Sequence, residues 1–269
     1  MMHRKNNIVV GLTTFNNEML RISVPVLGKI RQKFMLVVYN DNPMTNVTRR
    51  QIRRMGYCGD LQIINTNENV GELRARMAIV DAVRTMNPDW IIFCDDDDLL
   101  TNIDIPNVSP DNFAIMQNAI VIKHRVGDLL HAIDNPNEIE CDGENIELRR
   151  PNMAIAGTPV RTNVLIGLGD ILREISDTIS DIDDGLDFCP PVDEIMWNFV
   201  NIYARSINPD AVPIYMDQTS YIKNDIDTAR IKYGRLARPT RNANDQYHRI
   251  IDKYNAVLHS ALDAAALRG

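Results

Sequence analysis

The feature that most constrains the fold is a short apolar run that ends in a cluster of acids. Residues 90–94 are apolar, and Asp95, Asp96, Asp97 and Asp98 follow without interruption. A continuous apolar run of strand length is typical of a β-strand buried on both faces, as in a parallel sheet covered by helices. The acids would then lie at the carboxyl end of the strand, the edge where open α/β sheets bind ligands.

The acid cluster predicts a bound cation. In an extended chain Asp95 and Asp97 point to the same side, and four adjacent carboxylates repel one another. Ligand sets made only of oxygen favour Mg²⁺ or Mn²⁺, which commonly binds one or two carboxylates together with substrate phosphates. The alternative is a solvated acidic turn, and the position directly after a buried strand favours the binding site over that alternative.

The first hundred residues alternate between strand and helix patterns. Strand patterns cover residues 8–12, 35–39 and 61–65, in addition to the strand before Asp95. Helical patterns cover residues 18–33, 46–55 and 72–86. This alternation predicts an α/β fold with a Rossmann-like, doubly wound and mostly parallel sheet.

After the acids the regular alternation is lost, which predicts a mixed second half. We expect a strand over residues 113–124, with residues 126–133 as its hairpin partner, an acidic loop over 177–191 and a further strand over 212–216. Helices are expected over 159–175, 193–207 and 242–267. The chain is interpreted as one domain over 1–269, with a first half over about 1–100, a second half over about 101–240 and a C-terminal helix over about 241–269.

Composition limits the function classes. A chain of 269 residues with 45% hydrophobic residues can bury a core of its own. A net charge of −7 argues against a protein that binds nucleic acid over its whole surface, and the four cysteines form no Cys-x-x-Cys pair. No apolar run approaches the roughly 18 residues of a membrane span, and the first residues lead into a strand. We therefore expect a cytoplasmic protein, which could lie peripherally at the inner face of the membrane.

Four short motifs occur in order over about residues 7–100. They are Thr13-Thr14-Phe15-Asn16, Asn40-Asp41, the segment from Asn69-Val70-Gly71 to Ala75-Arg76, and Asp95-Asp96-Asp97-Asp98. Together they resemble the family-2 glycosyltransferases of the GT-A fold, which are nucleotide-diphospho-sugar transferases. In that family a polar turn follows the first strand, and an Asp-containing turn follows the second. An Asn-x-Gly-x-x-x-Ala-Arg segment opens the next helix, and an Asp-x-Asp-Asp motif follows a buried strand. The resemblance implies that about 1–100 is the nucleotide-sugar-binding half and about 101–240 the acceptor half.

The resemblance implies a role for each motif. Thr13 and Phe15 would line the base pocket, Asp41 would hydrogen-bond the base or ribose, and Arg76 would meet the nucleotide or diphosphate. The whole implied nucleotide-sugar set is Thr13, Phe15, Asn16, Asp41, Asn69, Gly71, Arg76, Asp95 and Asp96, and the implied Mn²⁺ or Mg²⁺ ligands are Asp95, Asp97 and Asp98. The alternative is ordinary turn chemistry for Thr13, Asn16 and Asp41, and a solvated helix face for Arg76.

Transfer to a hydroxyl also needs a general base, which this family places at the start of a helix in the acceptor half. Asp193 and Glu194 precede a helical pattern and fit that context, with Asp193 as the expected base and Glu194 as the second choice. The alternative is helix capping, because acids in a first turn stabilise many helices without any catalytic role.

The sequence thus predicts a metal-dependent, inverting glycosyltransferase that moves a sugar from a nucleoside diphosphate sugar, preferably a UDP-sugar, to an acceptor hydroxyl. A sugar nucleotidyltransferase and a catalytically inactive nucleotide-binding protein are the alternatives. The acceptor stays open between a glycan, a lipid-linked sugar, a polymer and DNA. A basic segment near residues 223–249 is a solvated surface, a loop that closes over the diphosphate, or a patch that faces an anionic acceptor. Its cations are Lys223, Arg230, Lys232, Arg235, Arg238, Arg241 and Arg249.

Overall fold

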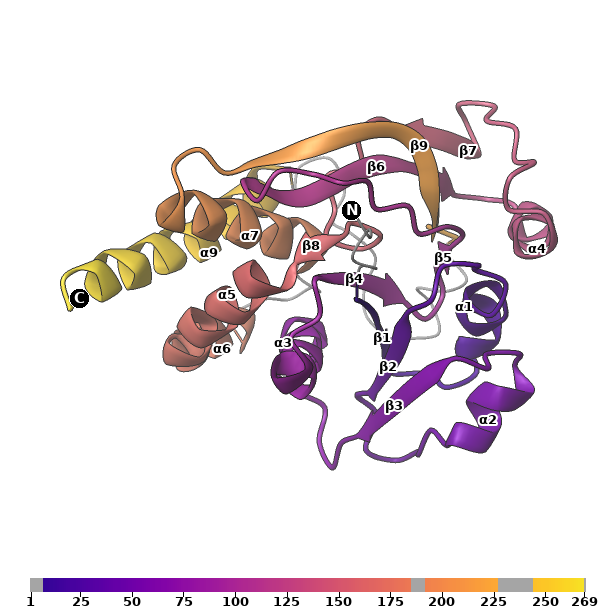
Figure 1. The fold of residues 1–269 in the computed structure, drawn as a ribbon, viewed down its shortest axis with the longest axis horizontal. Helices are drawn as coiled ribbons and strands as arrows, with labels where there is room; N and C mark the ends of the chain where they lie inside the picture. Colours follow the sequence, from indigo (N-terminus) through magenta and orange to yellow (C-terminus); the bar gives the residue numbers. More distant parts are fainter. Residues whose placement is uncertain (1–6, 185–191, 227–243, 269) are drawn as a thin grey trace, which may run out of the picture.

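One mixed sheet of nine strands runs through the computed structural model, which describes residues 7–184, 192–226 and 244–268 (Figure 1). Its first half is parallel, in the order β3-β2-β1-β4. These strands are β1 (Ile8–Thr14), β2 (Met35–Asn40), β3 (Asp60–Asn65) and β4 (Trp90–Asp95). The predicted parallel sheet is therefore confirmed, and all four strands end at the same edge.

Helices cover both faces of this parallel half. Successive side chains of β4 alternate, so that Ile91 and Phe93 join the core on the side of α3 (Glu72–Val83), which a short 3₁₀ turn (Arg84–Met86) continues. Ile92 and Cys94 join the core on the side of α1 (Leu20–Leu27) and α2 (Arg49–Arg54). Burial on both faces is the reason why the run before the acids is apolar at every position.

The second half of the sheet is mixed, as predicted. Beyond β4 the order is β8-β6-β9-β5, with β7 paired to the other part of β6. Strand β6 is parallel to β9 and antiparallel to β7 and β8, and β5 is antiparallel to β9. The bounds are β5 (Leu99–Leu100), β6 (Asn112–Ile122), β7 (Ile146–Arg149), β8 (Val160–Arg161) and β9 (Val212–Asn224).

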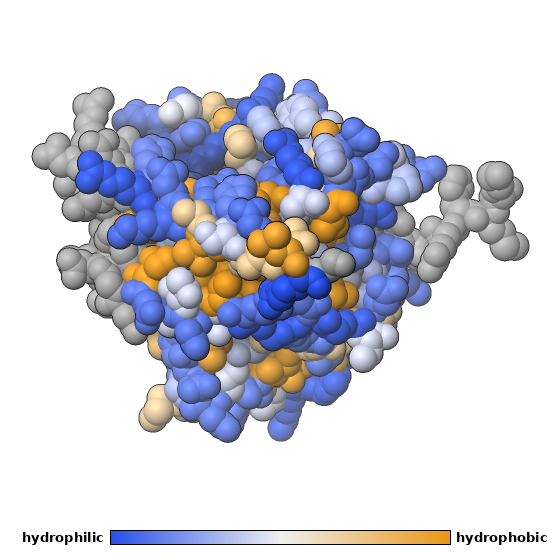
Figure 2. Space-filling model, turned by 90° about the vertical axis from the view of Figure 1, so that its left-hand side faces the viewer, coloured by the Kyte–Doolittle hydropathy of each residue, from blue (hydrophilic) through white to orange (hydrophobic). Residues whose placement is uncertain are grey.

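Four helices gather at one end of the molecule, on the left in Figure 1. They are α5 (Thr162–Glu174), α6 (Ser176–Asp184), α7 (Val192–Ile207) and α9 (Asn244–Ala266). Tyr254 and Leu258 of α9 are buried in the same core as α3 and α7. Figure 2 looks onto this end and shows hydrophobic residues at the surface between hydrophilic ones. Among the described helices, none combines the length and the apolar character needed to cross a bilayer.

Two local predictions are wrong. The expected partner strand over 126–133 is a helix, α4 (Val126–Asp134), which buries Leu129 and Ala132 at a helical spacing of three, and the hairpin partner of β6 is β7. Part of the expected acidic loop is the helix α6, and residues 185–191 lie outside the described residues. Strand β9 also continues well past its expected end, as far as Asn224.

Candidate active site

The acid run forms a tight turn at the edge of the sheet. Strand β4 ends at Asp95, and the backbone N–H of Asp98 donates to the carbonyl of Asp95 at 3.2 Å. The expected extended Asp-x-Asp geometry is therefore wrong, because the chain turns immediately after the strand. As a result, the carboxylates of Asp96 and Asp98 are anchored on different strands.

Asp96 is anchored on β1. The hydroxyl of Thr14 donates to its carboxylate at 2.6 Å, and the Asp96 side chain is buried. Burial raises the pKa of Asp96 to about 7; the Thr14 hydrogen bond opposes the shift, and the charges of Asp95 and Asp98 add to it. Asp96 thus fixes the turn to the end of the neighbouring strand.

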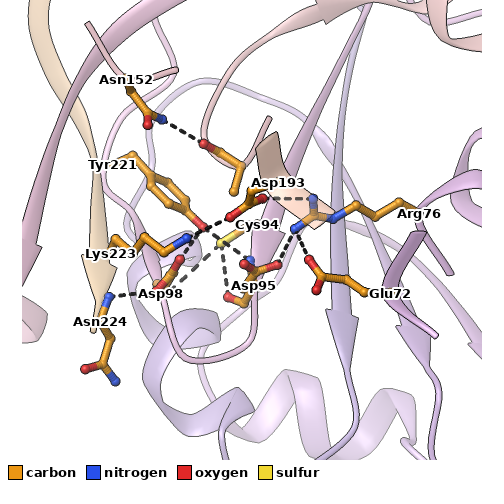
Figure 3. Close-up of polar contacts among 11 residues, drawn as sticks. Glu72, Arg76, Cys94, Asp95, Asp98, Asn152, Asp193, Tyr221, Lys223 and Asn224 are labelled. Atoms are coloured by element: carbon orange, nitrogen blue, oxygen red, sulfur yellow. Dashed lines mark hydrogen bonds and ion pairs between the residues drawn. The ribbon is translucent and has the colours of Figure 1, made fainter. Parts of the chain in front are cut away.

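Asp98 is anchored on β9. The Tyr221 hydroxyl donates to one of its carboxylate oxygens at 2.7 Å, and the backbone N–H of Asn224 donates to the other, also at 2.7 Å (Figure 3). Burial, reinforced by Asp97 and Asp95, raises the pKa of Asp98 well above its usual range. Because both oxygens already accept hydrogen bonds, the contacts favour Asp95 and Asp97 over Asp98 as metal ligands.

Asp97 differs from its neighbours in its hydrogen bonds. Burial raises the pKa of Asp97 well above its usual range, with further contributions from Asp96 and Asp95. Within the part of the chain that the structure describes, no other residue donates a hydrogen bond to its carboxylate, whereas Asp96 and Asp98 each accept at least one. Its oxygens are therefore placed to bind a ligand.

A buried arginine links three further carboxylates. The guanidinium of Arg76, on α3, contacts Glu72 at 2.5 Å, Asp95 at 2.8 Å and Asp193 at 2.9 Å (Figure 3). Burial alone would lower the pKa of Arg76, but the three acids raise it well above its usual value. Oxygens of the same three acids lie within 4.8 Å of one another, close enough to share a cation. In this structure the shared cation is Arg76.

Lys223, near the end of β9, is a second, partly buried cation of the site. Its ammonium contacts Asp193 at 2.7 Å, and the charges of Asp193, Asp98 and Asp95 outweigh burial and raise the pKa of Lys223. Burial would raise the pKa of Asp193, but Lys223 and Arg76 together hold it well below its usual range. A carboxylate with so low a pKa is a weak base.

Negative charge exceeds positive charge at this edge of the sheet. Arg76 and Lys223 are the cations that the described residues bring to six carboxylates, which are Glu72, Asp95, Asp96, Asp97, Asp98 and Asp193. Burial also raises the pKa of Glu72, to about 7, with Arg76 opposing the shift. Raised pKa values at four of the six acids mean that additional positive charge would be favourable here. Oxygen donors with this excess charge fit Mg²⁺ or Mn²⁺.

The first predicted nucleotide-binding turn lies beside the acids. Thr13 pairs in register with Asp95 across β1 and β4, and its side chain is buried. Phe15 follows on the surface, with 42% of its side chain exposed. Asn16 accepts a hydrogen bond from the backbone of Glu18 at 3.2 Å, which is ordinary turn geometry. The exposed ring of Phe15 is therefore the group of this turn that is most accessible to a base.

Asp41 is engaged with the backbone before α3. Its carboxylate accepts hydrogen bonds from the N–H groups of Val70, at 2.8 Å, and Gly71, at 3.0 Å. The Asn69 side chain also accepts from Gly71, at 3.0 Å, and Gly71 has a φ of +81°, which favours glycine. The structure thus brings Asp41, Asn69 and Gly71 together as one unit at the start of α3. Contact of Asp41 with a base or ribose stays a prediction.

The two candidate bases point to different sides of the first turn of α7. Asp193 faces Arg76 and Lys223, whereas Glu194 lines a groove of about 400 Å³ together with Arg149, Asn152 and Met153. Consecutive helix residues are rotated by about 100°, which accounts for this divergence. The two acids are therefore not interchangeable.

Glu72, Tyr221 and Asn224 were not identified from the sequence, and Lys223 was named only as part of the basic segment. Glu72 could have been found, because it lies one helical turn before Arg76 on the same face. Tyr221 and Lys223 could have been found by their spacing of two, which places them on the same face of a strand. The backbone contact of Asn224 left no signal in the sequence. Of the expected basic segment, Arg230, Lys232, Arg235, Arg238 and Arg241 lie outside the described residues, and Arg249 is exposed on α9.

Residues 10–109, which include β1 to β4 and the acid run, match the family model described as glycosyl transferase family 2. No curated protein matches the chain. A solved structure of S. aureus TarS 1-349 matches at 13% identity and a TM-score of 0.42, covering 81% of this chain and 60% of that one. This chain thus spans less than two thirds of the length of that TarS fragment.

Two further structures are similar. The mannosyltransferase PcManGT from Pyrobaculum calidifontis, in complex with GDP-Man and Mn²⁺, matches at 13% identity and a TM-score of 0.45, covering 99% of this chain and 77% of that one. The apo form of GlyE from Streptococcus pneumoniae TIGR4 matches at 12% identity and a TM-score of 0.39, covering 80% of this chain and 46% of that one. Residues 10–109 are thus similar to glycosyl transferase family 2, and the mixed α/β fold agrees with the GT-A fold that this similarity predicts.

Proposed function

We propose that the protein is a metal-dependent glycosyltransferase that moves a sugar from a nucleoside diphosphate sugar, preferably a UDP-sugar, to an acceptor hydroxyl with inversion. The observation that carries this proposal is the excess of carboxylates over cations at the end of β4. This acid cluster lies within, and directly beside, the segment that matches glycosyl transferase family 2.

Asp97 and Asp95 are the residues that would hold the metal. Asp97 accepts no hydrogen bond from another described residue, and Asp95 is bound by Arg76 through one carboxylate oxygen. A divalent cation bound there would neutralise negative charge on the departing diphosphate. Thr13 and Phe15 lie at the same edge of the sheet and would contact the base, next to the unit of Asp41 and Gly71.

Transfer follows from a single in-line displacement. The acceptor oxygen forms a bond to the anomeric carbon, and the bond from that carbon to the diphosphate oxygen breaks. Its electron pair leaves with the nucleoside diphosphate, and the proton of the acceptor hydroxyl passes to a carboxylate of the protein. Attack from the face opposite the leaving group inverts the anomeric configuration.

Glu194 is the better candidate for the base. Asp193 is held by Lys223 and the buried Arg76, which keep its pKa well below its usual range, so that it binds a proton weakly. Glu194 is the next residue of the same helical turn and lines the adjoining groove. We therefore assign Asp193 as a positioning residue that joins α3, α7 and β9, and Glu194 as the general base.

A screen of sugar nucleotides tests the proposed activity. The purified protein is incubated with UDP-sugars and GDP-sugars, with Mn²⁺ or with EDTA, and release of nucleoside diphosphate is measured. We expect release with at least one donor and Mn²⁺, none with EDTA, and loss of release in Asp97→Asn. Pyrophosphate formation from a sugar phosphate and a nucleoside triphosphate would instead show a nucleotidyltransferase, and nucleotide binding without turnover would show an inactive protein.

A further inference from the structure

The groove beside the acid cluster is a second concave surface that shares the first turn of α7 with it. It has a volume of about 400 Å³, and its lining includes Glu194 and the segment that follows β7. The backbone of this segment contacts α7 directly, because the N–H of Ile155 donates to the carbonyl of Asp193 at 3.3 Å. A ligand in the groove would therefore lie next to the first turn of α7, which also supplies Asp193 to the acid cluster.

The wall of the groove is fixed in place by buried contacts. The backbone N–H of Asn152 donates to the carbonyl of Gln117 on β6 at 2.7 Å, and its side-chain amide donates to the carbonyl of Ala156 at 2.9 Å (Figure 3). Gly157 has a φ of +79°, and a Cβ at this position would overlap the ring of Tyr221. The same tyrosine donates to Asp98, so the wall and the acid cluster share an anchor.

Arg150 is the cation of the groove that the described residues leave without a salt bridge. Glu147 is paired with Lys123 and lies 3.5 Å from Arg149, so its charge is compensated within the protein. Arg150 is exposed and, among the residues that the structure describes, takes part in no salt bridge. Arg150 interacts electrostatically with Asp217, but the carboxylate of Asp217 is already hydrogen-bonded to Asn118 and Tyr215.

The groove also offers an apolar surface. Met153 is 60% exposed, and Leu148, Pro151 and Ala154 line the groove with it. Sugar rings present C–H groups on one side and hydroxyls at the edge, so a surface that combines apolar side chains with charged ones suits them. The volume lies within the roughly 300–1,000 Å³ range of small-molecule sites.

We propose that this groove binds the acceptor, and that the acceptor is a carbohydrate with an anionic substituent. The anionic group would pair with Arg150, the apolar side of the ring would lie on Met153, and the reacting hydroxyl would face Glu194. This inference rests on the proposed transferase function, since it assigns the second substrate of the same reaction. It adds the chemical class of the acceptor and names Arg150 as the residue that selects it.

Three probes with one sugar ring and different charge test this proposal. Glucose, glucuronate and glucose 6-phosphate are titrated by ligand-observed NMR into the 269-residue chain saturated with UDP and Mn²⁺, so that the donor site cannot take up the phosphate. A charge-assisted hydrogen bond from Arg150 should make at least one of the two anionic sugars bind roughly tenfold more tightly than glucose. Arg150→Gln should remove this difference, and Arg54→Gln, at an exposed arginine on α2, should leave it unchanged.

The outcomes separate this inference from the proposed function. If UDP does not bind the wild-type protein with Mn²⁺, the donor site itself is wrong. If UDP binds normally but neither anionic sugar is preferred over glucose, or the preference survives in Arg150→Gln, the acceptor assignment is overturned and the proposed function stands. Met153→Ala provides a second check, because it should weaken binding of all three sugars by a similar factor without changing UDP affinity.

Discussion

Arg76 is the residue through which the two halves of the site meet. It extends from α3 and contacts Asp95 at the end of β4 and Asp193 on α7. Its side chain is fully buried, so removal of the guanidinium would leave three carboxylates without their partner. Arg76 therefore stabilises the arrangement in which the donor side faces the acceptor side.

The first prediction concerns the stability that Arg76 provides. Arg76→Met should lower the free energy of unfolding by about 3–5 kcal/mol, because breaking a buried ion pair leaves uncompensated charges. Arg76→Lys should recover only part of this loss, since an ammonium cannot reproduce the fork of the guanidinium. Urea unfolding followed by circular dichroism measures the difference, with Arg54→Met as the exposed control. A loss below about 1 kcal/mol in Arg76→Met would contradict the assignment.

The second prediction distinguishes Asp193 from Glu194. Glu194→Gln should lower kcat by roughly a hundredfold to ten-thousandfold with little change in donor affinity, because the base acts only in the transfer step. Asp193→Asn should mainly reduce stability, since the neutral amide loses its charge pairs with Arg76 and Lys223. Steady-state kinetics and unfolding of both variants provide the test. If kcat is near normal in Glu194→Gln and falls strongly in a folded Asp193→Asn, the general base is Asp193.

Individual residues of the site were predictable to different extents. The sequence places Asp95 to Asp98 at the end of a buried strand, and the structure confirms this position. It does not reveal that the run turns at once, because the turn depends on Thr14, Tyr221 and the backbone of Asn224, which are distant in the chain. Contacts between residues far apart in sequence leave little local pattern.

Among the elements, β9 and α9 complete the site and the core from late in the chain. Strand β9 pairs with β6 and β5 and brings Tyr221 and Lys223 to the acids. Helix α9 packs against α7, α5 and α6 at the opposite side of the site. Strand β9 therefore links the second half of the chain to the end of the parallel sheet, and α9 covers the helices α5, α6 and α7.

The third prediction tests the contribution of α9. Leu258 is fully buried against the core that includes α7, so Leu258→Ala should lower the free energy of unfolding by about 2–5 kcal/mol. Leu267 follows α9 and is 90% exposed, so Leu267→Ala should change the free energy of unfolding by less than about 0.5 kcal/mol. Equal effects of the two substitutions in denaturant titrations would show that α9 does not pack as described.

The elements themselves were largely predictable where burial was regular. The four parallel strands and their helices follow from alternating apolar and amphipathic segments, and the structure confirms them. Helix α4 was mistaken for a strand because Val126, Leu129, Leu130 and Ile133 are apolar in a short segment, for which strand and helix periods are hard to separate. The extent of β9 was missed because its first residues are partly exposed and its pairing with β6 is non-local.

At the scale of the whole molecule, the acid cluster makes stability depend on pH and on metal. The pKa values of Asp96 and Glu72 are both raised to about 7, from usual values of 3.8 and 4.5. In the folded protein these groups retain protons that the unfolded chain has already released. Their contribution to stability is therefore complete below about pH 4 and is lost as the pH rises through about 7.

The fourth prediction follows from this loss of stability with rising pH. In EDTA, the Tm should fall by a few degrees between pH 5 and pH 8, given that about 1 kcal/mol corresponds to roughly 2–4 °C in a chain of this size. Asp96→Asn keeps an oxygen acceptor for Thr14 and should make the dependence shallower. Excess Mn²⁺ should raise the Tm most at pH 8, where the carboxylates are ionised. A Tm that rises from pH 5 to pH 8 in EDTA would contradict the account.

The two halves of the molecule supply different residues of the site, because the acids lie between them. The parallel half carries the family match and supplies the acids, and the mixed half supplies Asp193, Lys223 and the groove. We propose that both halves form one catalytic unit over residues 1–269, because neither half contains the complete site. Arg235 and Arg238 lie outside the described residues, so their expected closure over the diphosphate stays a prediction.

The account depends most on metal-dependent donor binding by the acid run, and isothermal titration calorimetry of UDP tests this directly. Wild-type protein should bind UDP roughly tenfold more tightly with Mn²⁺ than with EDTA, since the cation would bridge the carboxylates and the diphosphate. Asp97→Asn should lose this increment while weak metal-independent binding remains, and Asp210→Asn, at an exposed aspartate, should behave as wild type. Equal UDP affinity with and without Mn²⁺ in the wild type, or an unchanged increment in Asp97→Asn, would contradict the central claim.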